Sequence, residues 1–182
     1  VRLPWSRCYW SLPFLSVLLT TPEVSAKLGK RHKTVAQVTS QVVCWLRRVL
    51  PGRTIELIGD GAYSVVTLGL RCRGQGVRLI TTLRLDARLF DHPSPKAGRR
   101  RLGRPAVVGQ RLPTLAQIAG ATTTRWQRCW LPWYGGQTKR LDWTTGTALW
   151  YSTGLTPLPI RWVLVRDPDG HLPTRAYCST AV

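Results

Sequence analysis

The stretch of residues 34–85 constrains the fold most, because helical and strand-like patterns alternate along it. Apolar residues recur at helical spacing from Thr34 to Leu50, and Pro51-Gly52 follows, which predicts a helix that ends at this turn. The run "RTIELIG" after the turn predicts a short strand. The branched residues of Val77–Leu85 predict another strand. Strands that alternate with helices are typical of α/β folds with parallel strands.

Two further elements are expected in this half of the chain. Ser64 is placed to cap a shorter helix that ends at Gly74 or Gly76. Upstream, the residues from Trp10 to Thr20 are rich in apolar side chains without helical spacing, which predicts a buried strand that opens the series.

The composition changes at Asp91. Residues 91–113 are rich in Pro, Gly and Arg and contain too few apolar side chains to pack, so we expect an extended basic loop. The Trp-rich residues that follow, with Gly135-Gly136 between two strand-like runs, predict a small antiparallel β section inserted into the α/β unit. Pro159–Gly170 adds a strand and a tight "DPDG" turn. Most of the tryptophans are expected to pack in the core, with Trp143 and Trp150 the better candidates for base stacking.

The chain is strongly basic, with 27 Lys and Arg against 8 Asp and Glu and a formal net charge of +19. A polyanion such as nucleic acid is the simplest partner for such a charge. The longest apolar stretch begins at Ser11 and is about half the length that a membrane span needs, so we expect no membrane partner. The 5 cysteines form no C-x-x-C pair, which favours reduced thiols over zinc ligands. The chain begins at Val1 and contains no Met, and we expect it to be a piece of a longer protein.

Asp60 is the candidate for chemistry, because it ends the apolar run of "ELIGD" in a chain that is poor in acid. Ligands of open α/β sheets bind at the carboxyl ends of strands, where a carboxylate can hold Mg²⁺ against a phosphate. The alternative is that "GDG" is a turn and that Asp60 only caps the following helix. The other acids are poor candidates for further metal ligands beside Asp60, since Asp86 follows the next strand and Asp167 and Asp169 lie in an expected surface turn.

Several blocks in order resemble the middle of a bacterial insertion-sequence transposase of the DDE superfamily endonuclease type. They are "WSLPFLSVL", "GKRHKT", "ELIGDGAYS", "LITTLRLDARLFD", "GRPAVVGQRLPTL", "WYGGQTKRLD", "ALWYSTGLTPLPIRWVLVRDPDG" and "RAYCST". The resemblance runs almost from end to end of the chain. It implies an α/β fold of the RNase H-like kind, a mixed sheet with helices that is interrupted by a β-rich insertion, in an incomplete domain.

The resemblance also implies a metal site of Asp, Asp and Glu that binds two Mg²⁺ or Mn²⁺ ions. The "D-x-x-Y" context of the second Asp matches Asp60 and Tyr63, so Asp60 is the expected catalytic metal ligand and Tyr63 is expected to pack against the site. The first Asp would precede Val1 and the Glu would follow Val182. The expected organisation is a partial catalytic core at 1–90, a basic loop at 91–113 and a β-rich insertion region at 114–182.

The function implied is transposon end cleavage and strand transfer, with transposon ends and target DNA as partners, a homodimer in a synaptic complex and a location in the bacterial cytoplasm at the nucleoid. Two basic segments are candidates for contact with DNA phosphates. They are Lys30, Arg31, His32 and Lys33, and Lys96, Arg99, Arg100, Arg101 and Arg104. The alternative function is a stand-alone basic nucleic-acid-binding module in which Asp60 is only a turn residue.

Overall fold

The computed structural model describes residues 13, 15–93 and 106–181. The described residues divide into two compact units, one up to residue 35 and one from residue 36 onward. The first unit contains helix α1 (Pro22–Lys27), and the hydroxyl of Thr21 caps it by accepting a hydrogen bond from the Val24 amide at 3.3 Å. Ser25 is buried on this helix, with its hydroxyl 2.7 Å from that of Thr20.

The predicted opening strand is wrong within the part of it that the structure describes. Residues 15–20 form no strand, and Leu18 is 89% exposed. An apolar run becomes a buried strand only where a neighbouring strand pairs with it, and no described strand does so here. The rest of the predicted strand, apart from residue 13, lies outside the described residues.

The series from residue 34 onward is confirmed. The elements are helix α2 (Val35–Val49), strand β1 (Ile55–Gly59), the single 3₁₀ turn η1 (Gly61–Tyr63), helix α3 (Val66–Gly74) and strand β2 (Val77–Leu83). The expected role of Ser64 is wrong, because the N-cap of α3 is Val65 and Ser64 instead ends η1.

The second half of the chain is mostly strand. It contains β3 (Leu89–Phe90), helix α4 (Leu115–Gly120), β4 (Gln127–Pro132), the turn η2 (Tyr134–Gly136), β5 (Thr138–Trp150), β6 (Leu158–Arg166) and β7 (Arg175–Ser179). The predicted hairpin at Gly135-Gly136 is confirmed, and both glycines have the positive φ angles, 69° and 74°, that favour glycine in tight turns. The "DPDG" turn is confirmed by the hydrogen bond from the Gly170 amide to the Asp167 carbonyl at 3.1 Å.

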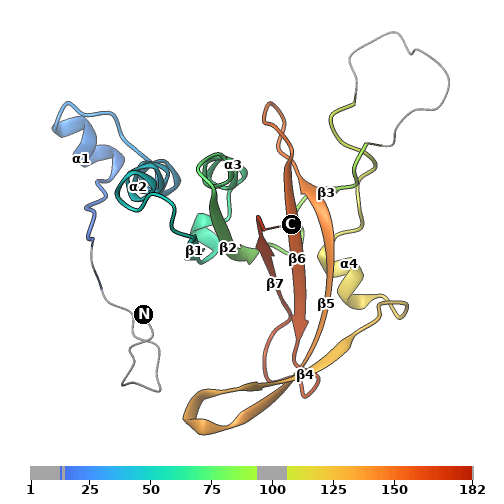
Figure 1. The fold of residues 1–182 in the computed structure, drawn as a ribbon. Coiled ribbons are helices and arrows are strands. Elements are labelled where there is room, and N and C mark those ends of the chain that lie inside the picture. The colour runs from blue at the N-terminus through green and yellow to red at the C-terminus, as the bar shows by residue number, and fades with distance from the viewer. Residues whose placement is uncertain (1–12, 14, 94–105, 182) are drawn as a thin grey trace. The chain divides into compact units, whose positions relative to one another are not determined.

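The described strands form one mixed seven-stranded sheet in the order β1-β2-β7-β6-β5-β3, with β4 paired to β5 (Figure 1). The β1–β2 pair is parallel, as the alternation of strands and helices predicts, and every other pair is antiparallel. The antiparallel strands are therefore not a separate β section, because β7 pairs directly with β2 and continues the same sheet. Residues 138–141 of β5 pair only with β4, so this hairpin extends beyond the other strands.

Helices α3 and α4 cover one face of this sheet. Leu158, Ile160 and Leu164 of β6 are 0% exposed, and they pack with Val66 of α3 and Leu115 of α4 in the main core cluster. A second cluster joins Val43 of α2 and Leu68 of α3 to β1 and β2. The helices thus hold the β1–β2 end of the sheet, where Asp60 lies.

The expected fold class is confirmed at the level of a mixed α/β protein with a mixed sheet and few helices. The RNase H-like assignment and the division at residues 90 and 113 stay predictions. None of the helices in the described ranges is long and apolar enough to span a membrane.

Candidate functional site

Strands β1 and β2 position Asp60 at the carboxyl edge of the only parallel pair among the described strands. Asp60 follows Gly59, the last residue of β1, which lies opposite Thr81 of β2. The hydroxyl of Thr81 donates a 2.6 Å hydrogen bond to the Asp60 carbonyl, and Thr81 is buried. This bond fixes the backbone at the point where the strand ends. Sequence reasoning missed Thr81, because its role depends on the pairing of two strands.

The side chain of Asp60 caps η1. Its Oδ1 accepts a hydrogen bond from the Ala62 amide at 2.9 Å, and the residue is exposed. The turn interpretation from the sequence is therefore confirmed as local geometry, although the capped turn is η1 and not helix α3. Oδ2 makes no hydrogen bond or ion pair to a described residue, which leaves one carboxylate oxygen for another ligand.

Tyr63 packs against the strand that leads to Asp60. A Cβ atom added to Gly59 would lie 2.7 Å from Cδ2 of the Tyr63 ring, so only glycine leaves room for the ring at this position. Tyr63 is half-buried at the edge of the second core cluster. The glycine and the ring together hold η1 against the end of β1.

Asp86, which also follows a parallel strand, is occupied by an ion pair. Arg84 donates two hydrogen bonds to its carboxylate, at 2.8 and 2.7 Å. The bonds from this guanidinium lower the pKa of the Asp86 carboxyl. Asp86 is therefore neutralised by its own neighbour, whereas Asp60 has no ion-pair partner in the described part of the chain.

Three other acids form ion pairs at β5 and the β6–β7 turn. Asp142 pairs with Arg128 and Arg166, both at 3.3 Å, and Asp169 pairs with Arg140. Asp167 is 2.9 Å from the Lys139 ammonium, and this hydrogen bond lowers the pKa of the Asp167 carboxyl.

These three carboxylates stabilise the end of the sheet from which the β4–β5 hairpin extends. Across residues 13, 15–93 and 106–181, no group of three or more His, Cys, Asp or Glu could hold a metal ion.

The two predicted basic segments have different outcomes. Lys30, Arg31 and Lys33 are exposed in the link between α1 and α2, as a contact with phosphates would need. His32 is half-buried, and its Nδ1 is buried without a hydrogen-bond partner among the described residues. The second segment, Lys96, Arg99, Arg100, Arg101 and Arg104, lies outside the described residues.

The tryptophans that sequence reasoning favoured for base stacking are not the exposed ones. Trp150 is 9% exposed and belongs to the main core, and Trp143 is half-buried. Trp130 on β4 is 63% exposed. Trp150 ends β5 directly after the buried Ala148 and Leu149, so the polar residues farther along the sequence do not describe its own surroundings.

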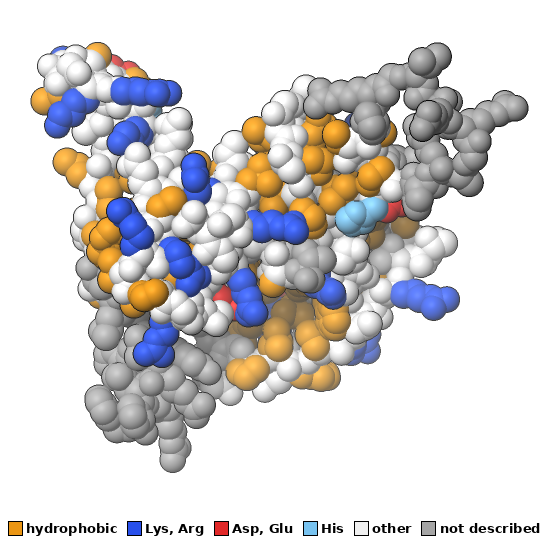
Figure 2. Space-filling model, turned by 45° about the horizontal axis from the view of Figure 1, so that its top comes forward, with side chains coloured by type: hydrophobic (Ala, Val, Ile, Leu, Met, Phe, Trp, Pro, Cys, Tyr) orange, Lys and Arg blue, Asp and Glu red, His pale blue; other side chains and the backbone are white. Residues whose placement is uncertain are grey.

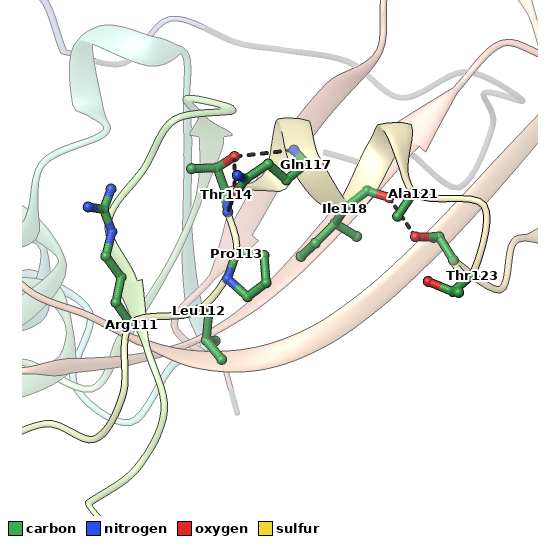
Figure 3. A pocket seen from close by; sticks show the side chains of 9 residues that line it. Arg111, Leu112, Pro113, Thr114, Gln117, Ile118, Ala121 and Thr123 are labelled. Carbon is green, nitrogen blue, oxygen red and sulfur yellow. Dashed lines mark hydrogen bonds between the residues drawn. The ribbon is translucent and has the colours of Figure 1, made fainter.

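A hollow of about 800 Å³ lies beside α4, and Asp60 is not among the residues that line it (Figure 3). Thr114 and Gln117 line it and form the capping box of α4. The Gln117 backbone amide donates to the Thr114 hydroxyl at 3.2 Å, and the Thr114 backbone amide donates to Oε1 of Gln117 at 2.8 Å. The polar groups at the start of this helix are therefore used within the fold. The hollow contributes no carboxylate, histidine or cysteine to a chemical site.

The chain matches no protein-family model, and no curated protein matches it at a significant level.

Proposed function

We propose that this chain is part of a DNA transposase of the DDE type, in which Asp60 is a metal ligand for phosphoryl transfer. The observation that supports this most is the position of Asp60, exposed at the carboxyl edge of a parallel strand pair and without an ion-pair partner among the described residues. This edge is where ligands bind in open α/β sheets. Asp86, Asp142, Asp167 and Asp169 are each paired with Arg or Lys. Glu23 and Asp91 also form no ion pair with a described residue, but Glu23 lies in α1 and Asp91 follows the antiparallel strand β3, so neither lies at the edge of the parallel pair.

Asp60 fits a divalent metal as one ligand of several. Mg²⁺ is bound through one or two carboxylates together with water and substrate phosphates, and Oδ2 of Asp60 is available for such a bond. Two bound Mg²⁺ or Mn²⁺ ions would activate the attacking oxygen and stabilise the leaving oxygen of an in-line displacement at phosphorus. Asp60 would act as a ligand and not as a nucleophile, and the resemblance assigns the other two carboxylates to positions outside this sequence.

The partners in this proposal are transposon ends and target DNA, and the working form is a homodimer in a synaptic complex at the bacterial nucleoid. The net charge of +19 supports a polyanionic partner. Lys30, Arg31 and Lys33 are exposed and precede helix α2 in the sequence. We expect their contacts to be to DNA phosphates.

A second candidate is a nucleic-acid-binding module without catalysis. It is favoured by the hydrogen bond between Asp60 Oδ1 and the Ala62 amide, which gives Asp60 a structural role that needs no metal. In this case the chain would bind DNA or RNA through phosphates alone.

The experiment uses a protein that includes this chain and compares Asp60→Asn with Asp86→Asn as the matched control. Asn keeps the size of the side chain and remains a good N-cap, so this change removes the charge and leaves the cap of η1 in place. We expect Asp60→Asn to abolish Mg²⁺-dependent cleavage of transposon ends while DNA affinity stays within about twofold, because phosphate contacts do not involve Asp60. Asp86→Asn should cut normally. Full cleavage by Asp60→Asn would exclude Asp60 as a metal ligand.

A further inference from the structure

Helices α2 and α3 pack side by side against β1 and β2 (Figure 1). Residues of both helices line a groove. Val43 of α2 and Cys72 of α3 are buried together in the second core cluster. A cavity of about 230 Å³ is lined by Arg48 and Cys44 of α2 and by Arg71 of α3, together with Ser40 and Gln41. A second hollow of about 280 Å³ runs along α3 and is also lined by Arg71. The groove therefore has one arginine from each helix.

The charge in this groove is uncompensated. Arg48 and Arg71 are exposed, and neither forms an ion pair with a described residue. Helices α2 and α3 contain no Asp or Glu. Figure 2 shows several Lys and Arg side chains on the side of the molecule where these helices lie. Like charges that face a common groove repel each other, and a bound anion would offset this repulsion.

The neighbouring Arg47 shows what a structural arginine looks like in this place. Its guanidinium donates to the carbonyls of Gln75 and Gly76, both at 2.8 Å, and to that of Arg53 at 2.9 Å. These bonds hold α2 against the turn between α3 and β2. Arg48 makes no such bond to a described residue, so its guanidinium donors remain available.

Both groove arginines lie in the last turn of their helices, where a cation interacts favourably with the helix dipole. That interaction is reason enough for a basic residue at each helix end. The interaction with the helix dipole does not explain why the two arginines line the same groove. It also does not explain why both helices lack acidic residues.

We propose that the groove between α2 and α3 binds a backbone phosphate of DNA, with Arg48 and Arg71 donating from its two sides. The planar guanidinium matches the oxygen pair of a phosphodiester and stays charged at all working pH values. This inference rests on the DNA partner of the proposed function and adds the place where the duplex backbone lies.

The test measures the affinity of the chain for a fluorescent DNA duplex by anisotropy over a range of salt concentrations. Arg48→Gln/Arg71→Gln is compared with Arg88→Gln/Arg161→Gln, which removes two charges from exposed arginines that also have no ion-pair partner among the described residues. We expect the groove variant to lose about tenfold or more in affinity and to reduce the slope of log K against log salt by about 1, since the two arginines contact one phosphate and each lost phosphate contact lowers the slope by about 1. The control should lose about threefold or less, through net charge alone.

A second measurement uses the unaltered chain, so that it does not depend on the folding of a variant. Phenylglyoxal modifies accessible guanidinium groups, and peptide mass spectrometry locates them. We expect bound duplex to protect Arg48 and Arg71 and to leave Arg88 and Arg161 reactive.

Each outcome has a different meaning. Equal losses in the two double variants, or no protection of Arg48 and Arg71, would overturn the groove assignment while leaving DNA as the partner. Competition by polyglutamate as strong as competition by DNA would overturn a phosphate site in favour of an acidic-protein surface. No DNA binding by the unaltered chain at low salt would instead reject the DNA partner of the proposed function.

Discussion

The contact between Gly59 and Tyr63 predicts that Gly59→Ala will be costly. The added Cβ would lie 2.7, 2.8 and 2.9 Å from Cδ2, Cγ and Cβ of Tyr63, whereas carbon atoms pack best at about 3.5–4.0 Å. Rotation of the ring cannot relieve the contact with Cβ of Tyr63, so the backbone of η1 must move. Overpacking of this kind costs about 1–3 kcal/mol, and η1 is the turn that Asp60 caps.

Urea unfolding followed by tryptophan fluorescence measures this loss. For an m value of about 2 kcal/mol/M, we expect the midpoint to fall by about 0.5–1.5 M. Gly74→Ala is the matched control, because a Cβ there meets nothing within 4 Å, and it should leave the free energy of unfolding unchanged or raise it by up to about 1 kcal/mol. In a Tyr63→Ala background two of the three close contacts are absent, so Gly59→Ala should cost less by about 1 kcal/mol. An equal cost in both backgrounds would refute the steric explanation.

Two further predictions concern titratable groups in the fold. Asp167 has a folded-state pKa below its unfolded value, so the stability that it contributes is present above about pH 4 and is lost as the pH falls through the folded-state pKa. Lys139→Met should therefore lower the urea midpoint at pH 7, and the difference from the unaltered chain should narrow towards pH 3; a constant difference would show that the ion pair is not responsible. Burial raises the pKa of the Cys72 and Cys178 thiols to about 11. Iodoacetamide at pH 8 should therefore label the half-buried Cys44 and Cys129 in the folded chain, and should label Cys72 and Cys178 only after unfolding. Peptide mass spectrometry identifies the labelled cysteines. Labelling of Cys72 in the folded chain would contradict its burial.

The elements that could be predicted from the sequence are those with local signals. Helix α2 has apolar residues at helical spacing and ends at Pro51-Gly52, and the β4–β5 hairpin turns at two glycines with positive φ. The strand β1 was predictable for the same reason, because a short apolar run lies between two turns. These signals also located Asp60 at the end of β1.

The features that escaped prediction depend on residues far apart in the chain. Thr81 of β2 pairs with Cys178 of β7, and nothing near either residue indicates that the two halves share one sheet. The exposure of Leu18 has the same origin, since an apolar run does not specify whether a partner strand exists. After Asp60 the short turn η1 separates strand β1 from helix α3. Ser64 therefore ends η1, and Val65 is the N-cap of α3.

The measurement that tests the role of Asp60 most directly is the effect of Mn²⁺ on the amide NMR signals of the chain bound to a short DNA duplex. Mn²⁺ replaces Mg²⁺ at oxygen sites and broadens the signals of nearby nuclei. We expect the amides of Gly61 and Ala62, which lie next to the Asp60 carboxylate, to broaden first in the unaltered chain and to stay sharp in Asp60→Asn, which keeps the cap and removes the charge. Equal broadening in the two proteins, or broadening centred on the acids of β5 and the β6–β7 turn, would contradict a metal site at Asp60.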